Sequence, residues 1–359
     1  MDSSGVSAMG ALTLGPKDAA PVNPIPPQQN PRPKAAFVIL SQATPERVVY
    51  LKSTLYFLFR RFNARPDARY PVRVLHEGDF DERLQAEIRA GLRGDCGDLL
   101  SFVRLDPGDF DVPTWIDRAR LDRNIAAQPV PYWRDLRYRL MCRFWLAHAH
   151  KYVDDLDHYC RLDDDAWIED DVPGDFIAAA AAAGAVLAGA IVHVDCPICT
   201  HGMRGLFRSL GLATDANDAR LFVRAPLSRQ FLEGIDAVPE YDGAGAMVAH
   251  MPVNLFNNFS VNDVAFWRRP DVRAVLRAID ATGNVFYYRW GDAPIITLIA
   301  STLGTVAVPG PFGGSGGMQL LRVRYSKRLQ RQAFIDGAGL AHRYMPATYA
   351  EDSSAVVIA

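Results

Sequence analysis

Three consecutive carboxylates, Asp163, Asp164 and Asp165, follow the short apolar run from His158 to Leu162. Side chains on a strand alternate between faces, so an extended backbone would place Asp163 and Asp165 on one side and Asp164 on the other. Two carboxylates on one side form a hard-oxygen site for a divalent cation, which can neutralise a diphosphate. The triplet therefore indicates either the metal site of a protein that binds a nucleotide sugar or, as the alternative, a solvated acidic turn.

The composition is that of an ordinary folded protein. With 359 residues, of which 49% are hydrophobic and 22% charged, the chain can bury the core of one large α/β domain or two smaller ones. The net charge of -2 gives no reason to expect binding of nucleic acid or of an anionic membrane surface. The 5 cysteines are too few for a disulfide scaffold, and their odd number leaves at least one thiol unpaired.

The first 34 residues are rich in Pro, Gly, Ser and Ala, and they predict a flexible leader. They contain no apolar run long enough for a signal peptide or a membrane anchor, so we expect the chain as written to be soluble and leave its compartment unassigned. Residues 176–194 approach the length of a transmembrane helix, but Gly184 and Gly189 interrupt them. A buried helix that leads into a buried strand explains this stretch better.

Apolar runs of strand length alternate with helical patterns in the first third of the chain. Thr44 and Pro45 are typical of a helix N-cap and first turn, and they follow a predicted strand at 35–41. The alternation favours a mainly parallel sheet with helices on both faces, whose ligands collect at the carboxyl ends of strands. The other expected elements are strands at 72–75, 102–105 and 186–194, helices through Leu84, Ile88 and Leu92, at 133–152 and at 271–282, a Gly and Pro loop at 309–317, and a solvated basic insertion at 322–331.

Several separated motifs are similar to those of one family. The residues from Phe286 to Pro294 read Phe-Tyr-Tyr-Arg-Trp-Gly-Asp-Ala-Pro, and those from Tyr138 to Phe144 read Tyr-Arg-Leu-Met-Cys-Arg-Phe. Both are close to blocks of glycosyltransferase family 15, the fungal Golgi α-1,2-mannosyltransferases. Three further matches are Pro113 to Asp117, Asn258-Phe259 and Phe266-Trp267. The chain resembles this family from about residue 35 to 346.

The resemblance implies a GT-A type glycosyltransferase fold, an α/β architecture with a single mixed, mainly parallel sheet flanked by helices. It implies a donor-binding half at about 35–170, an acceptor-binding half at about 171–346 and a tail at 347–359. The implied activity is transfer of mannose from GDP-mannose to a hydroxyl of a mannosylated glycan or related acceptor, with retention at the anomeric carbon and with Mn²⁺ or Mg²⁺ as cofactor. The implied partners are a nucleotide sugar donor and a glycan acceptor.

The resemblance also assigns residues to roles. The block from Tyr159 to Asp165 resembles the family's metal-binding block, and Asp336 to His342 resembles the block that supplies its metal-binding histidine. The expected metal ligands are Asp163, Asp165 and His342, and the expected donor-binding residues are Arg139, Arg143, Arg161 and Asp164. The expected catalytic residues are Asp292, Tyr138, Ser260 and Asp263. The expected acceptor-binding residues are Tyr287, Arg289 and Trp290. Alternatives are structural ion pairs for the arginines, a buried aromatic for Tyr138, an Asx-turn for Asp292 and a structural histidine for His342.

The chain departs from the family at a position where the family has a glutamate proposed as nucleophile. Ser260 stands there, and serine cannot supply the same negative charge, which disfavours a covalent double displacement. Asp263 is a substitute carboxylate, or else Ser260 and Asp263 form a helix-capping pair. Tyr288 and Ile296 also replace a family glutamate and histidine, which bears on donor and acceptor choice. A front-face mechanism needs no such glutamate. The alternatives to a mannosyltransferase are a non-catalytic relative that binds a nucleotide sugar or a glycan, and a transferase that uses another nucleotide sugar.

A Cys-Pro-Ile-Cys motif spans Cys196 to Cys199, with His201 close behind. Zinc would need a fourth ligand that no nearby residue clearly offers. Metal binding or redox chemistry is therefore the alternative, and the default interpretation is a local disulfide or a loop near the acceptor cleft.

Overall fold

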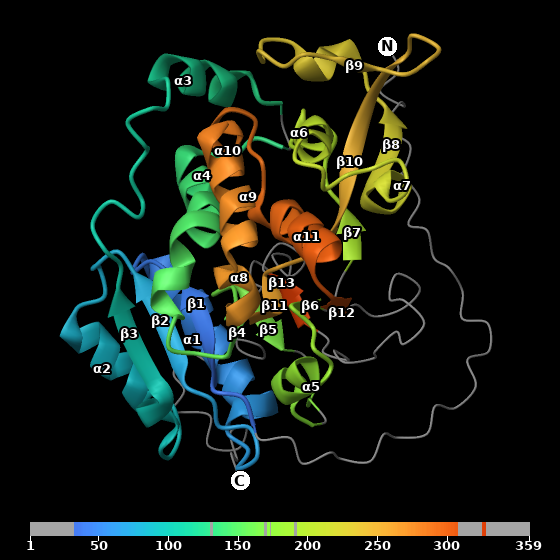
Figure 1. The fold of residues 1–359 in the computed structure, drawn as a ribbon. Helices are drawn as coiled ribbons and strands as arrows, with labels where there is room; N and C mark the ends of the chain where they lie inside the picture. Colours follow the sequence, from blue (N-terminus) through green and yellow to red (C-terminus); the bar gives the residue numbers. More distant parts are fainter. Residues whose placement is uncertain are drawn as a thin grey trace, which may run out of the picture. The chain divides into compact units, whose positions relative to one another are not determined.

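The central sheet of the fold is mixed and is the largest of its sheets among the described residues (Figure 1). The computed structural model describes residues 32–129, 132–168, 171–172, 174–189, 192–307 and 325–327. Within these residues the sheet has seven strands, and β11 is antiparallel to both of its neighbours while the other pairs are parallel. Their order is β12 (Val306–Ala307), β6 (Leu187–Gly189), β11 (Phe259–Asp263), β4 (His158–Leu162), β1 (Ala35–Leu40), β2 (Val72–His76) and β3 (Leu100–Arg104). The predicted mixed, mainly parallel sheet is confirmed.

Helices begin where the sequence supplies a capping side chain. Thr44 accepts a hydrogen bond from the Arg47 amide at the start of α1 (Pro45–Leu58), as predicted, and Asp81 does the same for α2 (Glu82–Ala90). Aspartates also cap α3 (Arg118–Ala127), α4 (Leu136–Arg143), α5 (Phe176–Ala182) and α8 (Val264–Arg268). The remaining helices are α6 (Met203–Ser209), α7 (Asp218–Leu221), α9 (Pro270–Ala281), α10 (Asn284–Tyr287) and α11 (Asp292–Leu303).

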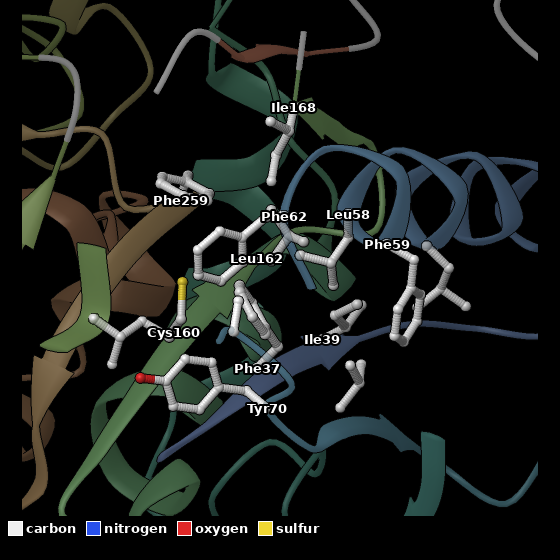
Figure 2. Packing of buried hydrophobic residues seen from close by; sticks show 14 of the residues in the cluster. Phe37, Ile39, Leu58, Phe59, Phe62, Tyr70, Cys160, Leu162, Ile168 and Phe259 are labelled. Carbon is white, nitrogen blue, oxygen red and sulfur yellow. The ribbon is translucent and has the colours of Figure 1, made fainter. Parts of the chain in front are cut away.

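Aromatic side chains fill the core on one face of the sheet (Figure 2). The Phe37 ring, on β1, meets the rings of Phe62 and Phe176 edge-on, with centroids 5.9 and 6.2 Å apart. Leu162 at the end of β4 packs into the same cluster, together with Phe259 of β11. This packing fixes the end of β4, and with it the position of the aspartate triplet that follows.

Two predicted elements differ from the structure. The helix predicted at 133–152 begins at Leu136, because Asp135 caps it, and after Arg143 it continues as a π-helical segment, Phe144–His148, and a 3₁₀ turn, Ala149–Tyr152. Strands are present in the region predicted at 186–194, but the stretch is divided between two sheets. β6 lies in the central sheet and β7 (Val192–Val194) lies in a smaller one.

The smaller sheet is antiparallel and is built around the long strand β10 (Met247–Leu255). β10 pairs with β7, with β8 (Phe222–Pro226) and with β9 (Glu240–Tyr241). Part of the predicted basic insertion, Tyr325–Lys327, forms β13 and pairs with β5 (Ala166–Ile168). The rest of that insertion, the loop at 309–317 and residues 1–31 of the leader lie outside the described residues. No helix in the part of the chain that is described is both long and apolar enough to cross a membrane.

Candidate active site

A cavity of about 330 Å³ opens beyond the carboxyl end of β4. Its walls come from five separate parts of the chain: the end of β4, helix α4 with the residue Arg134 before it, β7 and the residue after it, β10 and the turn after it, and the start of α11 with the residues before it. Sixteen residues line it, and five of them were predicted as site residues: Tyr138, Arg161, Asp163, Arg289 and Asp292.

Arg161 links two carboxylates of this cavity, Asp163 and Asp292. Its Nε donates to Asp163 Oδ1 at 3.2 Å, and its Nη1 donates to Asp292 Oδ2. The guanidinium also stacks on the Trp145 ring, 4.2 Å from the ring centroid. Burial opposes the charge on Arg161, but the two carboxylates outweigh this effect and raise the pKa of the guanidinium. Arg161 therefore stays charged and holds Asp163 and Asp292 in a fixed arrangement.

Asp292 is almost fully buried, at 3% exposure, and is the first residue of α11. Besides Arg161, the side-chain amide of Asn257 donates to its Oδ2 at 2.6 Å. The positive end of the helix dipole also favours a carboxylate at this position. Asp292 thus begins a helix rather than forming an isolated turn before Pro294, and its negative charge is held at the cavity wall.

The aspartate triplet forms a turn and not a strand, so the predicted alternation of its side chains is wrong. β4 ends at Leu162, and the Ala166 amide bonds back to the Asp163 carbonyl at 3.0 Å. Asp163 faces the cavity, whereas Asp164 and Asp165 are both within ion-pair distance of Arg47 in α1. The turn therefore separates Asp163 from its two neighbours.

Asp164 is completely buried and is tied to two helical side chains and one residue after β1. Its carboxylate accepts from Ser41 Oγ at 2.7 Å and from Arg47 Nε at 2.9 Å, and its carbonyl accepts from Thr54 Oγ1 at 2.7 Å. These contacts lie away from the cavity lining. They anchor the turn to α1, which gives Asp164 a structural role, and its contact with the donor stays a prediction.

Asp163, which the sequence assigned to a cation, lines the cavity, and carboxylate oxygen is a ligand type that Mn²⁺ and Mg²⁺ prefer. Across residues 32–307, with the gaps given above, no three His, Cys, Asp or Glu side chains come together as a metal cluster. The expected ligand His342 lies outside the described residues. A cation at Asp163 would therefore need oxygens from a bound diphosphate and ligands from elsewhere in the chain.

Tyr138 and Arg289 form another wall of the cavity. The Arg289 guanidinium lies 5.3 Å from the centroid of the Tyr138 ring. The neighbouring Cys142 and burial raise the pKa of Tyr138 well above its ordinary value, so its hydroxyl remains a proton donor in hydrogen bonds. Tyr138 and Arg289 together offer an aromatic face, a hydroxyl and a positive charge to a ligand.

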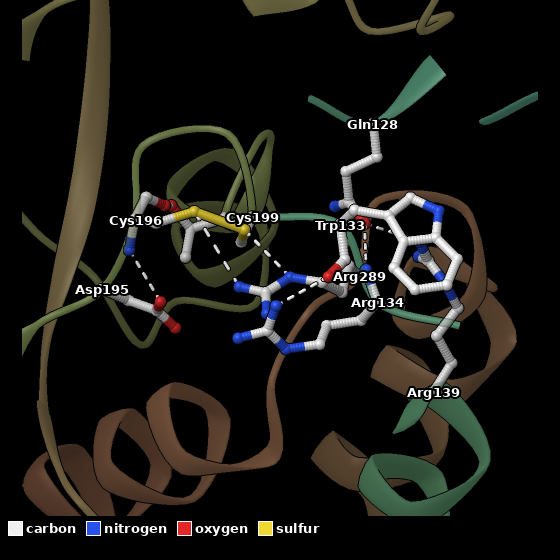
Figure 3. Close-up of a disulfide and its surroundings, with 9 residues drawn as sticks. Gln128, Trp133, Arg134, Arg139, Asp195, Cys196, Cys199 and Arg289 are labelled. Carbon is white, nitrogen blue, oxygen red and sulfur yellow. Dashed lines mark hydrogen bonds between the residues drawn. A yellow bond between two sulfur atoms is a disulfide. The ribbon is translucent and has the colours of Figure 1, made fainter. Parts of the chain in front are cut away.

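Arg289 is held by a disulfide, which confirms the default interpretation of the Cys-Pro-Ile-Cys motif. Cys196 and Cys199 are bonded, and Arg289 Nε donates to Cys199 Sγ at 3.0 Å (Figure 3). Arg289 has a φ of 61°, an uncommon backbone conformation for a residue other than glycine. The other cysteines, Cys96, Cys142 and Cys160, are free and buried.

The remaining predicted residues with described side chains lie outside the cavity lining. Two of the expected catalytic residues have other partners. Ser260 is fully buried in β11, where its Oγ donates to the Asn257 carbonyl at 3.4 Å. Asp263 caps α8 by accepting from the Phe266 amide at 3.1 Å. The capping alternative therefore applies to Asp263 alone, since Ser260 lies within a strand.

The expected donor residues Arg139 and Arg143 have partners within the protein. Arg139 donates to the Phe286 carbonyl at 2.7 Å, and Arg143 pairs with Asp280 at 2.9 Å. The expected acceptor residues Tyr287 and Trp290 are also buried. The Asp117 amide donates to the Tyr287 hydroxyl at 2.9 Å, and Trp290 Nε1 donates to the His201 carbonyl at 2.9 Å. Tyr288 and Ile296, which replace family residues, are not in the lining either.

Sequence reasoning missed several polar residues of the cavity, among them His193, Asp195, Asn254 and Asn257. Asp195 directly follows a strand, and the rule that ligands collect at the carboxyl ends of strands could have found it. Asn257 precedes the recognised Asn-Phe pair. Asn254 is part of an apolar strand and gave no signal of its own.

The comparisons with known proteins agree with the motifs. A family model described as glycolipid 2-alpha-mannosyltransferase matches residues 13–183 and 244–306. The α-1,2 mannosyltransferase KTR1 of Saccharomyces cerevisiae is 23% identical over 295 residues, covering 77% of this chain and 66% of the relative. Glycolipid 2-alpha-mannosyltransferase 2 of Candida albicans is 25% identical over 294 residues, with coverages of 78% and 56%. The chain thus spans between 56% and 66% of the length of these two relatives.

Solved structures show the same fold. Core-mannan synthase A of Aspergillus fumigatus, in a form with Mn and GDP, gives a TM-score of 0.61 at 19% identity, covering 84% of this chain and 76% of that one. The mannosyltransferase Ktr4p of S. cerevisiae in complex with GDP also gives 0.61, at 17% identity, with coverages of 77% and 68%. The expected GT-A type fold is confirmed.

Proposed function

The chain belongs to the glycolipid 2-alpha-mannosyltransferase family, and we propose that it transfers mannose from GDP-mannose to a hydroxyl group of a mannosylated acceptor. One observation carries the proposal. Arg161, Asp163, Asp292 and Tyr138 come from three motifs that are far apart in the sequence, and all four line one cavity. A cavity with fixed charges and an aromatic face is what a nucleotide sugar and a glycan both require.

The donor diphosphate would bind at the side of the cavity formed by Asp163 and Arg161. A divalent cation held by Asp163, and by His342 as expected from the sequence, would neutralise the charge that develops on the leaving diphosphate. The guanidinium groups of Arg134 and Arg289 also line the cavity and offer further positive charge to phosphate oxygens.

The acceptor hydroxyl would bind to Asp292, because this carboxylate is fixed by Arg161 and Asn257 and accepts hydrogen bonds. In the reaction the bond between the mannose C1 and the diphosphate oxygen breaks, and its electron pair stays on that oxygen. The acceptor oxygen bonds to C1 from the same face, and its proton passes to the leaving phosphate oxygen. This front-face route retains the anomeric configuration without a protein nucleophile.

Ser260 supports the front-face route over double displacement. It lies inside β11, paired with β4 and β6, and is absent from the cavity lining. The absence of a carboxylate at this position also favours a second candidate function, a non-catalytic relative that binds the nucleotide sugar or a glycan.

Turnover separates the two candidates. GDP release is measured with GDP-mannose, Mn²⁺ and α-methyl mannoside or α-1,2-mannobiose, and the product is examined by NMR for the configuration of its new linkage. Acceptor-dependent GDP release with an α-linked product supports the transferase. Binding of GDP-mannose without turnover, together with turnover gained by Ser260→Glu, would support the non-catalytic relative. Turnover with another nucleotide sugar in place of GDP-mannose would overturn the proposed donor.

A further inference from the structure

Part of one wall of the cavity comes from residues outside the family match. The family model covers residues up to 183 and again from 244, and β7 lies between these two blocks. His193 of β7 and Asp195, just beyond it, both line the cavity. This wall is therefore where the chain can differ from its relatives in the ligand that it selects.

His193 and Asn254 form a cross-strand pair in this wall. β7 and β10 are antiparallel, and His193 lies directly opposite Asn254 in their register. Residues directly opposite each other have side chains on the same face of a sheet. Both residues line the cavity, and the His193 ring also meets the Phe256 ring edge-on, with centroids 5.0 Å apart.

Three polar atoms of this pair have no hydrogen-bond partner among the described residues. Asn254 is completely buried, yet neither Oδ1 nor Nδ2 of its side chain makes a hydrogen bond, and His193 Nε2 makes none. Buried polar atoms are rarely left in this state, because the loss of their hydrogen bonds to water is costly. Asn254 also borders a neighbouring cavity of about 270 Å³, but His193 lines only the 330 Å³ cavity of the candidate active site.

We propose that Asn254 and His193 recognise two neighbouring hydroxyl groups of the acceptor sugar. This inference rests on the proposed function and adds the residues that select the acceptor. The Asn254 amide offers one acceptor and a donor group, and neutral histidine offers either role, which matches hydroxyl groups that both donate and accept. Burial lowers the pKa of His193, so the ring is neutral at pH 7. The Asp195 carboxylate on the same wall would repel phosphate, which favours an uncharged sugar here.

The test uses Asn254→Leu and His193→Phe, which keep approximate shape and remove the polar atoms. Binding of α-methyl mannoside and α-1,2-mannobiose is measured by ligand-observed NMR in the presence of GDP and Mn²⁺, and GDP binding is measured separately by calorimetry. Each variant should bind the mannosides about tenfold more weakly, as expected for one lost hydrogen bond, and should bind GDP like the native chain. Asn254→Leu should also be at least as heat-stable as the native chain, because no internal hydrogen bond is removed.

His158→Phe is the matched control, since His158 of β4 also has an unpartnered ring nitrogen but does not line the cavity. It should leave mannoside binding unchanged. Unchanged mannoside affinity in Asn254→Leu and His193→Phe would overturn the inference, as would weaker GDP binding instead. A loss of heat stability without any change in mannoside binding would indicate that the polar atoms of Asn254 and His193 bind ordered water, and it would also overturn the inference. Failure of the native chain to bind GDP would refute the proposed function. Its binding of mannosides would still test whether Asn254 and His193 recognise the sugar.

Discussion

Replacing Asp292 with asparagine should cost about 3 kcal/mol of stability and abolish transfer. The change removes the negative charge that faces Arg161, whose side chain is only 4% exposed. Breaking a buried ion pair by removing one partner costs roughly 3–5 kcal/mol. We expect the lower end of this range, because Asp163 and the Trp145 ring still contact the guanidinium. At roughly 2 °C per kcal/mol for a chain of this size, the melting temperature should fall by about 6 °C.

Asp280→Asn is the matched control for this experiment. It breaks the ion pair of Asp280 with Arg143, in which Asp280 is 23% exposed and neither residue lines the cavity. We expect a loss of about 1 kcal/mol with turnover retained. The free energy of unfolding is measured by urea titration and turnover by GDP release. Equal losses of stability in the two variants, or native turnover in Asp292→Asn, would refute the reasoning that the Arg161–Asp292 pair organises the site.

Three further changes test other parts of the structure. Serine at both Cys196 and Cys199 should lower the free energy of unfolding by about 2 kcal/mol through loss of loop closure, and dithiothreitol should match this effect in the native chain but not in the variant. Burial lowers the pKa of His150 from 6.5 to about 4 in the folded state. As the pH falls, His150 therefore becomes protonated in the unfolded chain before it does so in the folded chain. Urea titrations should show stability falling between these two pH values, with a flatter slope in His150→Gln. Asp164→Asn should lose about 3 kcal/mol through its buried pair with Arg47 while calorimetry finds GDP affinity unchanged; weaker GDP binding would place Asp164 in the donor site.

The sequence predicted the elements whose local signals are strong. The Thr44-Pro45 start of α1 and the strands before and after it are at the expected places, because capping and apolar runs act within a few residues. The split of 186–194 into β6 and β7 was not predictable in the same way. Both pieces are apolar enough for a strand, and the choice between two sheets depends on pairing with β11 and β10, which lie far along the chain.

The candidate site was predictable where residues belong to recognised motifs, and less so where packing decides their direction. Asp163, Arg161 and Asp292 were expected and share one cavity. Asp164 has the same residue type as Asp163, yet the turn after Leu162 directs it to Arg47, because Arg47 supplies the charge that a buried carboxylate requires. Asn254 has an inward side chain within an apolar strand, and only the tertiary fold shows that this position borders a cavity.

The most direct test of the proposed donor site is the melting temperature of the native chain and of Asp163→Asn with GDP-mannose, each with and without Mn²⁺. A ligand at about 100 times its dissociation constant adds roughly 2.7 kcal/mol to the stability of the folded state, which is readily measured. We predict stabilisation of the native chain that requires Mn²⁺ and is lost in Asp163→Asn. Equal stabilisation of both proteins without Mn²⁺, or none in either, would contradict it.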